Sequence, residues 1–543
     1  MNGHERIAQT LKILGITHVY SLSGVPIKST LPACSKVGIR TIGVRHQQAA
    51  VLMAAAHNYR AGRLLAVTIV SAGPAITNAA TGILVAWDNC WPLIVIAGTG
   101  PKMSRRGTFQ VFDGVPVFQT ITKWAARISS SSQISDFLTR GFQASTLEQP
   151  GPVYLEIPEN ALQETSSCPI KPFLNSAKPP KLDSTHIAEA TRVITEAQRP
   201  TVIIGKGARW SEPFNELRRL VEMYQIPFIT SPMGRGFLPD DHHLCFNTAR
   251  DFVQEKADVL LIVGARLNWT FRFGTQFSPD AKVIHIDIAQ KELMNDRVGA
   301  IGINGDVKHV LQEMLGHMEQ QTSEHQGTRA RNDWLEHLNT IRQTLTLELE
   351  KKIQVPNQPM TPHRLMKEIR DFVPRNAICV LDGRDTMAAA QETLLSFEPA
   401  TRFTAGSNGC MGVGIPFAIG AKMSAPERLV IVVTGDMAFG ISAMEMETAM
   451  RHKISIIVII VNNDGGCATE MHRTLYPPDH EFVARFQPRL SYEKVMEACG
   501  GYAESVNRPE EVQPALHRAV TSGLPACINV YVNPQAPFKN YLG

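Results

Sequence analysis

Two side chains with hard oxygen ligands follow two apolar stretches in the C-terminal part of the chain. Asp436 comes shortly after the apolar run at residues 429–433, and Asn463 comes shortly after the run at residues 456–461. Carboxylate and amide oxygens are ligands that Mg²⁺ and Ca²⁺ take in proteins. Glycines stand close to both residues, and the backbone at a glycine can approach an anion closely. The pattern therefore predicts a divalent cation that holds a phosphorylated ligand.

The elements that must position these side chains are also evident. Neither apolar run shows the polar alternation of a half-exposed strand, and the stretch at residues 439–450 between them favours a helix. This predicts two parallel strands, buried on both faces and joined by a helix. Because ligands bind beyond the carboxyl ends of such strands, Asp436 and Asn463 are expected at one edge of the sheet. Taken alone, each residue is more often an ordinary turn or helix-cap residue than a metal ligand.

The rest of the chain alternates short apolar runs with helical stretches. This predicts an α/β fold with three doubly wound parallel-sheet domains, at residues 1–165, 186–320 and 360–543. A linker rich in Pro, Lys and Ser is expected at residues 166–185, and a polar, flexible connection at residues 317–357. The other expected elements are a helix at residues 331–352 and strands at residues 19–22, 41–44, 65–70, 93–97, 153–157, 201–204, 259–263 and 283–288.

The composition excludes several classes of protein. A hydrophobic content of 44% over 543 residues indicates a globular chain with large cores, and a net charge of +4 gives no reason to expect a nucleic acid partner. The longest apolar runs have the length of strands, so no membrane span is expected. The N-terminus lacks the apolar core of a signal peptide, and the last residues are not a peroxisomal signal. With nine scattered cysteines, expected to be reduced and mostly buried, these features predict a cytoplasmic protein.

The spacing of Gly435-Asp436 and Asn462-Asn463 resembles the cofactor signature of thiamine diphosphate enzymes. Ile419, Gly420, Pro426, Ile431, Val433 and Ala438 also fall at the spacing of that family. The resemblance implies that Asp436, the side chain of Asn463 and the carbonyl of Gly465 ligate Mg²⁺, which in turn binds the diphosphate. The further cofactor contacts that it implies are Gly24, Pro26, Gln47, Asn78, Asp385, Gly409, Met411, Met437, Ala438, Gly466 and Cys467.

Several strings resemble one branch of the family more narrowly, namely 2-hydroxyacyl-CoA lyase and oxalyl-CoA decarboxylase. These strings lie at residues 89–92, 264–269, 410–414 and 435–440. The resemblance implies pyrimidine-binding, central and diphosphate-binding domains in that order. It also implies that the cofactor lies between the first domain of one subunit and the third of another, hence a homodimer or a dimer of dimers.

The chemistry implied by the resemblance starts with loss of a proton from C2 of the cofactor's thiazolium ring. A bulky side chain between the two rings bends the cofactor so that its own 4′-amino group reaches C2. Met411 holds the family position for that side chain, and the carbonyl of Gly409 would accept from the amino group. The alternative for Met411 is a core methionine beside a glycine-rich turn.

The position of the activating glutamate differs from the family pattern. The string Arg45-His46-Gln47-Gln48-Ala49-Ala50 fits the family string except that Gln47 replaces the glutamate that shares a proton with pyrimidine N1′. An amide can donate a hydrogen bond to that nitrogen but cannot protonate it, so slower activation is expected. Gln110 is the predicted substrate-facing residue, and in its string Val111 replaces a family glutamate.

Other substitutions fall on neighbouring pocket strings, at residues 382–385 and 464–467, and Met437 stands where the family usually has a small residue. The metal and ring-bending positions are therefore kept while substrate-facing positions change. These substitutions therefore concern the substrate more than the cofactor.

The resemblance implies two further features that could bind a nucleotide. Lys206, Arg266, Asp287 and Asp306 match positions that bind ADP in the oxalyl-CoA enzyme, where cations would take phosphates and a carboxylate the ribose hydroxyls. Arg402 stands where the branch places basic residues near the CoA nucleotide, and the alternative is a solvated surface arginine. Flavin is not expected.

The sequence thus predicts a thiamine diphosphate- and Mg²⁺-dependent lyase or carboligase that acts on a carbon–carbon bond next to a carbonyl. The expected substrate is a 2-hydroxyacyl or 2-oxo compound, in one version a CoA thioester. Two alternatives stay open. The chain could be a carboligase or 2-oxoacid decarboxylase with a non-CoA substrate, or a catalytically silent paralogue that still binds the cofactor.

Overall fold

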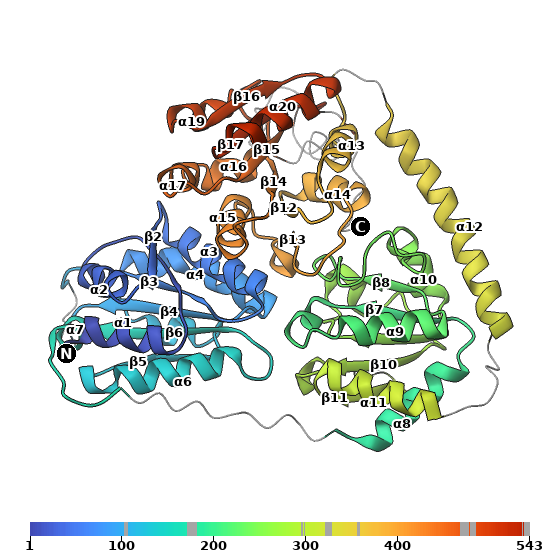
Figure 1. Ribbon diagram of the computed structural model, residues 1–543, viewed down its shortest axis with the longest axis horizontal. Helices are drawn as coiled ribbons and strands as arrows, with labels where there is room; N and C mark the ends of the chain where they lie inside the picture. The colour runs from blue at the N-terminus through green and yellow to red at the C-terminus, as the bar shows by residue number, and fades with distance from the viewer. Residues whose placement is uncertain are drawn as a thin grey trace. The chain divides into compact units, whose positions relative to one another are not determined.

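The computed structural model describes residues 1–101, 107–170, 182–294, 297, 299–320, 328–355, 359–466, 477, 485–534 and 536. The chain divides into two compact units. The first unit combines Met1–Ala177, Ala377–Met387 and Thr404–Gly543, and the second combines Lys178–Asn376 and Ala388–Phe403. The first unit therefore joins the two ends of the chain, and each unit is described by itself below (Figure 1).

The N-terminal sheet of the first unit has the strand order β2-β1-β3-β4-β6-β5, with parallel pairing between neighbours. The strands predicted in this part are confirmed to within one or two residues. A short edge strand, Trp124–Arg127, was missed because its apolar run is only three residues long and two of them are alanine. The strands are β1 (His18–Ser21), β2 (Arg40–Gly43), β3 (Ala66–Val70), β4 (Leu93–Thr99), β5 (Trp124–Arg127) and β6 (Pro152–Pro158).

Helices cover both faces of this sheet, as a doubly wound fold requires. Helices α1 (Gly3–Ile13) and α6 (Ile134–Thr146) lie on one face, and α3 (Gln47–Ala61) and α4 (Pro74–Asn89) on the other (Figure 1). The remaining helices of this part are η1 (Ile27–Ser29), α2 (Thr30–Lys36), α5 (Gly114–Phe118), η2 (Ser131–Gln133) and α7 (Glu159–Gln163).

The C-terminal sheet of the first unit places β12, β14, β15, β17 and β16 next to one another in that order. The predicted neighbours β14 and β15 are parallel and paired from Ile431 with Ile457 to Gly435 with Val461, so both runs end at the same edge. The strands are β12 (Ile378–Asp382), β14 (Val430–Gly435), β15 (Ile457–Asn462), β16 (Tyr502–Val506) and β17 (Ala526–Tyr531). The helices are α15 (Gly414–Ser424), α16 (Asp436–Ser442), α17 (Glu445–Arg451), α19 (Glu493–Ala498), α20 (Pro509–Ser522) and η7 (Gly406–Asn408).

The single helix predicted at residues 439–450 is wrong in detail. Two short helices, α16 and α17, stand in its place, and the first begins three residues earlier, at Asp436. Between them the backbone tightens, because the N–H groups of Met446 and Glu447 donate to carbonyls three residues back, at Ala443 and Met444. Such i→i+3 bonds form a tighter turn than an α-helix and separate the two helices.

The N-terminal and C-terminal parts of the first unit pack through α3 and α15. Residues 414–421 of α15 are all buried. A Cβ atom added to Gly420 would lie 2.1 Å from the backbone oxygen of Met53 in α3. The two helix backbones therefore approach at a distance that glycine permits and any other residue would disturb.

The second unit contains the central sheet, with strand order β11-β10-β9-β7-β8 and parallel pairing. The three strands predicted here are confirmed, and the short strands β8 and β11 were missed. The strands are β7 (Pro200–Ile204), β8 (Phe228–Thr230), β9 (Val259–Val263), β10 (Lys282–Asp287) and β11 (Ile301–Asn304). Its other elements are α8 (Ser184–Glu196), η3 (Lys206–Trp210), α9 (Phe214–Tyr224), η4 (Asn247–Ala249), α10 (Arg250–Lys256), η5 (Trp269–Gly274), η6 (Gln290–Glu292), α11 (Val307–Gln320), α12 (Thr328–Ile353), α13 (Pro362–Phe372) and β13 (Arg402–Phe403), and α14 (Arg384–Thr393) runs from the first unit into the second.

The helix predicted at residues 331–352 is confirmed as α12. The predicted linker falls largely on residues 171–181, outside the described residues, as do residues 321–327 and 356–358 of the predicted connection. The fold class, three parallel-sheet α/β arrangements, is confirmed, and the exact domain boundaries stay a prediction. Of the cysteines, Cys34, Cys245, Cys379 and Cys527 are buried, Cys90, Cys410 and Cys499 are partly buried, Cys168 is exposed, and Cys467 lies outside the described residues.

Candidate functional site

The carboxylate of Asp436 lies at the tip of β14 and ties together two neighbouring strand ends. Its side chain is 2% exposed. Oδ1 accepts from the backbone N–H of Met437 (2.7 Å), and Oδ2 accepts from that of Gly465 (2.8 Å) in the turn after β15. Burial raises the pKa of Asp436 to about 6. A buried carboxylate with two amide donors has lone pairs left for a cation, which would offset the cost of burying its charge.

The turn after β15 separates the roles of the two asparagines. Asn462 is 2% exposed and points into the fold, where its Nδ2 donates to the carbonyl of Leu490 (3.0 Å). Its Oδ1 accepts from the N–H of Asp464 (3.2 Å), which has a φ of 63°. Asn462 thus shapes the turn and leaves Asn463, half-buried, next in the chain and in the same turn as Gly465. A hard oxygen set at this edge fits Mg²⁺ and a diphosphate, as the sequence predicts.

Met437 departs from the small residue of the family, and Gly466 accommodates it. A Cβ atom on Gly466 would lie 2.1 Å from Cε of Met437, so the two residues are in direct contact. Ala438, the next predicted residue, is fully buried. Asp385 lies half-buried in the first turn of α14, whereas Cys467 lies outside the described residues.

The predicted ring-bending residue Met411 lies on an exposed turn. Its side chain is 38% exposed, so the alternative of a core methionine is wrong. Gly409, two residues before it, has a φ of 68°. Asp382, at the end of β12, holds the far side of this turn by accepting from the N–H groups of Gly412 (3.2 Å) and Gly414 (2.7 Å).

Asp382 was not predicted as a site residue, although an aspartate that ends a fully apolar strand is a usable signal. It is buried, and this burial raises its pKa to about 6. Because its two oxygens hold the backbone that follows Met411, Asp382 helps to position the Met411 side chain.

Gln47 is the first residue of α3, and its amide is already oriented. The side chain is 7% exposed, and its Oε1 accepts from Nδ2 of Asn78 (3.1 Å) on α4. With its oxygen engaged, the amide has its Nε2 hydrogens to present to an acceptor. The structure thus brings together two of the predicted contacts, Gln47 and Asn78.

The other predicted residues of the N-terminal part lie at strand and helix ends nearby. Gly24 lies against Ser71, which follows β3, since a Cβ atom on Gly24 would meet the hydroxyl oxygen of Ser71 at 2.8 Å. Pro26 is buried and follows a cis peptide bond. Gln110 packs on Gly73, the N-cap of α4, because a Cβ atom on Gly73 would lie 2.8 Å from that of Gln110. Gln110 therefore lies beside the N-terminus of the helix that carries Asn78.

The C-terminal end of α4 contacts the segment that leads to Met411. Nδ2 of Asn89, which is 1% exposed, donates to the carbonyl of Ala405 (3.1 Å). Asp88 accepts from Nδ2 of Asn408 (2.9 Å). Asn89 belongs to the string at residues 89–92 that resembles the lyase branch, and no role was predicted for it. Here it joins the N-terminal part of the unit to the glycine-rich turn of the C-terminal part.

In the second unit, the four residues predicted to bind ADP follow the carboxyl ends of four neighbouring strands. Lys206 follows β7, Arg266 follows β9, Asp287 ends β10, and Asp306 follows β11. Arg266 pairs with Glu292 through two hydrogen bonds of 2.9 and 2.8 Å.

The two aspartates of this set also support the backbone. Asp287 accepts from the N–H of Ala289 (2.9 Å), and burial raises its pKa to about 6. Asp306 accepts from the N–H of His309 (3.1 Å) at the start of α11. Their shared edge is compatible with a nucleotide, but helix capping accounts for Asp306 equally well.

Arg402 corrects one expectation. The alternative of a solvated surface arginine is wrong, because the side chain is fully buried. Its guanidinium donates to Oγ of Ser396 (2.9 Å) and to the carbonyl of Leu394. The arginine therefore supports the fold of the second unit at this position.

Among the helices of the described residues, none combines the length and apolar character needed to cross a membrane.

Comparison with known proteins shows which family the chain belongs to. Residues 1–117, 187–314 and 383–530 match the N-terminal TPP binding, central and C-terminal TPP binding domains of thiamine pyrophosphate enzymes. The chain is 32% identical to 2-hydroxyacyl-CoA lyase 1 of Homo sapiens, over 99% of this chain and 96% of that protein. It is 32% identical to acetolactate synthase large subunit IlvG of Mycobacterium tuberculosis, over 99% and 97% of the two chains. It is 29% identical to oxalyl-CoA decarboxylase of Escherichia coli K12, over 98% and 95%.

The family matches cover the stretches that contain Gln47, the central sheet and Asp436 in the predicted order, and relatives above 30% identity extend over the whole chain. The chain therefore belongs to the thiamine pyrophosphate enzyme family, as its motifs predict.

Proposed function

We propose that this protein is a thiamine diphosphate- and Mg²⁺-dependent lyase or carboligase that acts on a carbon–carbon bond next to a carbonyl. The observation that carries the proposal is the buried carboxylate of Asp436, bonded to the N–H of Gly465 in the turn after the neighbouring strand. Asp436, Asn463 and the carbonyl of Gly465 would hold the metal. When bound, thiamine diphosphate supplies a carbon nucleophile and an electron sink.

The residues of the chain would bind and orient this cofactor. Met411, exposed on its turn, would press between the two rings, and the carbonyl of Gly409 would accept from the amino group of the pyrimidine. Gln47, oriented by Asn78, would donate a hydrogen bond to the pyrimidine nitrogen without protonating it. Gln110 would face the substrate. The remaining contacts would come from the predicted backbone and small residues, Gly24, Pro26, Asp385, Met437, Ala438, Gly466 and Cys467.

For the substrate we favour a 2-hydroxyacyl-CoA, because relatives named 2-hydroxyacyl-CoA lyase and oxalyl-CoA decarboxylase align over almost the whole chain. If the substrate is a CoA thioester, we also propose that ADP binds in the second unit, at Lys206, Arg266, Asp287 and Asp306. A second candidate is a carboligase with a non-CoA substrate, favoured by an acetolactate synthase relative of equal identity. The burial of Arg402 also favours this second candidate, since its guanidinium is used within the fold.

We further propose a homodimer or a dimer of dimers in the cytoplasm. Sedimentation of the purified protein at several concentrations tests the assembly, and a sedimenting species of monomer mass at every concentration would contradict it.

Titration of the purified protein with thiamine diphosphate in magnesium buffer, followed by calorimetry, tests the cofactor. We expect saturable heat that disappears when EDTA removes the metal. Absence of heat in magnesium buffer contradicts the proposal.

Deuterium exchange at C2 of the bound cofactor then separates an enzyme from a silent paralogue. An enzyme accelerates the exchange over free cofactor, whereas a silent paralogue leaves it at the solution rate. Incubation of the loaded protein with a 2-hydroxyacyl-CoA, or with a 2-oxo acid, distinguishes the two substrate classes by the aldehyde or the carbon dioxide released.

A further inference from the structure

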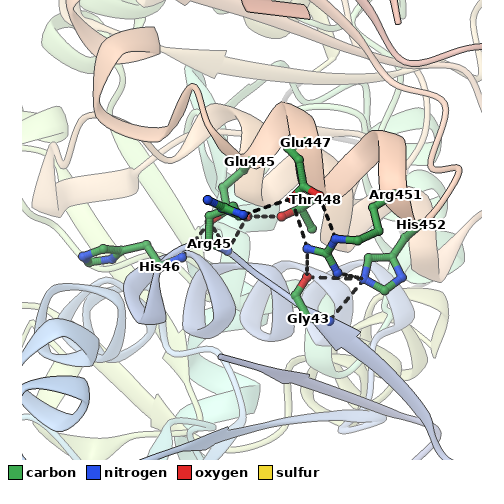
Figure 2. A network of polar contacts seen from close by, with 8 residues as sticks. All are labelled: Gly43, Arg45, His46, Glu445, Glu447, Thr448, Arg451 and His452. Atoms are coloured by element: carbon green, nitrogen blue, oxygen red, sulfur yellow. Dashed lines mark hydrogen bonds and ion pairs between the residues drawn. The ribbon is translucent and has the colours of Figure 1, made fainter. Parts of the chain in front are cut away.

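The segment between β2 and α3 is held by the helix α17 of the C-terminal part of the first unit (Figure 2). This segment runs from Gly43, at the end of β2, to His46, just before Gln47. Arg451 donates to the carbonyl of Gly43 (2.9 Å), and Nε2 of His452 lies 3.2 Å from the N–H nitrogen of the same residue. The segment that leads to Gln47 therefore takes its position from residues four hundred places away in the sequence.

Glu445 makes the most buried contact of this network. Its side chain is 2% exposed. Oε1 accepts from the backbone N–H groups of Arg45 (3.1 Å) and His46 (3.0 Å), and Oε2 accepts from Oγ1 of Thr448 (2.7 Å). Oε2 also lies 3.3 Å from the nitrogen of Arg45. A buried carboxylate is tolerated where donors surround it, and here the backbone of the approach to Gln47 supplies them.

His46 connects Glu445 to the first turn of α3 by one hydrogen bond on each side of Gln47. Its N–H donates to Glu445, and its ring Nδ1 accepts from the N–H of Gln48 (3.2 Å) as the N-cap of α3. Gln47 stands between these two bonds in the sequence, and its side chain is fixed separately by Asn78. The ring of His46 points away from the network, so its backbone and not its ring meets α17 (Figure 2).

A carboxylate suits this place better than an amide. It offers acceptors alone, and the segment presents donors alone at Arg45 and His46. In a Glu445→Gln variant whose oxygen faces the segment, the NH₂ group could donate to the hydroxyl of Thr448, but the second contact with the N–H of Arg45 and the negative charge would be lost. Glu447, two residues on, differs: its carboxylate bonds the side chain of Arg451 (2.8 Å) and lies 3.9 Å from that of Arg45.

We propose that Glu445 is a positioning residue for Gln47. It holds the N-terminal end of α3 so that the amide of Gln47 presents its hydrogens at a fixed place. The inference rests on the proposed function, because Gln47 has something to meet only when the cofactor is bound. The stretch that begins with the proposed metal ligand Asp436 also contains Glu445. In the proposed dimer, Asp436–Arg451 of one chain would therefore anchor one cofactor and position the residue that meets the pyrimidine of the other cofactor.

The test places Glu445→Gln in three backgrounds that differ at residue 47: the natural Gln47, Gln47→Glu and Gln47→Ala. The measurement is the rate of C2 deuterium exchange of thiamine diphosphate bound at saturation with Mg²⁺. In the Gln47→Glu background, where the contact is strongest, we expect a loss of about 10–100-fold, as for other residues that orient a functional side chain. In the natural protein the loss is smaller, and in the Gln47→Ala background it vanishes.

Glu447→Gln serves as the matched control. It lies on the same helix and in the same network but bonds side chains, so its exchange rate should stay within about fivefold of the parent in all three backgrounds. Glu445→Asp keeps the carboxylate and Thr448→Val removes one of its donors, so both give graded losses should Glu445→Gln fold poorly. Circular dichroism melts establish the folded fraction of each variant.

An equal loss in all three backgrounds, including Gln47→Ala, would show a general structural role and overturn the inference. No loss in the Gln47→Glu background overturns it as well. Failure of the parent protein to bind thiamine diphosphate overturns the proposed function and this inference together. If the parent proteins bind the cofactor and exchange its C2 proton, but Glu445→Gln slows the exchange equally in all three backgrounds, this inference alone is overturned.

Discussion

The two halves of the candidate site in the first unit differ in charge. At the strand tips of the C-terminal part, Asp436 and Asp382 are buried carboxylates whose pKa values are raised to about 6. At the start of α3 in the N-terminal part, two amides, Gln47 and Asn78, bond each other. The C-terminal half therefore already presents carboxylates that a cation would neutralise. The N-terminal half, in contrast, can donate a hydrogen bond to a pyrimidine nitrogen but cannot transfer a proton to it.

Gln47→Glu would place a carboxylate in the half that now has only amides at this position, and it has the largest expected effect. The new carboxylate can accept from Asn78 with one oxygen and share a proton with the pyrimidine through the other. We expect C2 exchange of the bound cofactor to speed up by about 10²–10⁴-fold, the usual worth of a positioned general acid. Gln48→Glu adds the same charge one residue on and should leave the rate near that of the parent. An unchanged rate in Gln47→Glu, with the cofactor bound, would place Gln47 outside the site.

Asp436→Asn tests the other half. It removes the charge that would hold the metal, and cofactor affinity in magnesium buffer should fall by about 100-fold or more, because even residues that merely support metal ligands contribute 10–100-fold. Isothermal titration measures the affinity. Glu427→Gln, an exposed acid before β14, should bind as the parent does. Equal affinities for Asp436→Asn and the parent would contradict the assignment of the metal site.

Asn89→Ala tests how the two halves are joined. The substitution leaves the buried carbonyls of Val85 and Ala405 without their side-chain donor. We expect a loss of about 1–3 kcal/mol in the free energy of unfolding, measured by urea denaturation. Asn408→Ala removes a less buried bond, to Asp88, and should cost less. A greater loss for Asn408→Ala would reverse this ranking of the two contacts.

The halves should also respond to acid in opposite directions. Burial lowers the pKa of His57 to about 3 and that of His18 to about 4, so the unfolded chain, with a histidine pKa near 6.5, takes up more protons between pH 6.5 and 4. Both histidines therefore lower stability as the pH falls. The raised pKa values of Asp436 and Asp382 act the other way between pH 6 and about 4, since the folded form then binds more protons.

His57→Gln removes one of these opposing groups. The slope of unfolding free energy against pH between 6 and 4 should become less positive by about 1.4 kcal/mol per pH unit, measured from urea curves without metal or cofactor. Asp382→Asn should shift the slope in the opposite sense. The same slope in all three proteins would contradict the assigned protonation of these groups.

The sequence was informative where a pattern is local. Apolar runs predicted most strands to within two residues, and the ends of β14 and β15 brought Asp436 and the turn of Asn463 together as expected. Some strands with shorter or alanine-rich apolar runs, such as Trp124–Arg127, were missed. The break between α16 and α17 was also missed, because it depends on backbone hydrogen bonds that cannot be predicted from the residue types.

Contacts between distant segments could not be predicted from the sequence for a different reason. Glu445 and Asn89 are ordinary helix residues by composition, and their partners are backbone groups of the other part of the unit. Backbone groups carry no residue identity, so such bonds leave no signature in a single sequence. For Arg402 the charge favoured an exposed place or a ligand, yet the fold buries it against Ser396 and Leu394.

The close packing of α15 on α3 has a consequence for synthesis of the chain. Helix α3 ends at Ala61 and α15 begins at Gly414, a separation of roughly 350 residues (414 minus 61). At translation rates of about 5–20 residues per second, the ribosome needs roughly 20–70 s to make the covering helix. During that interval the face of α3 that will pack on α15 lacks this native partner.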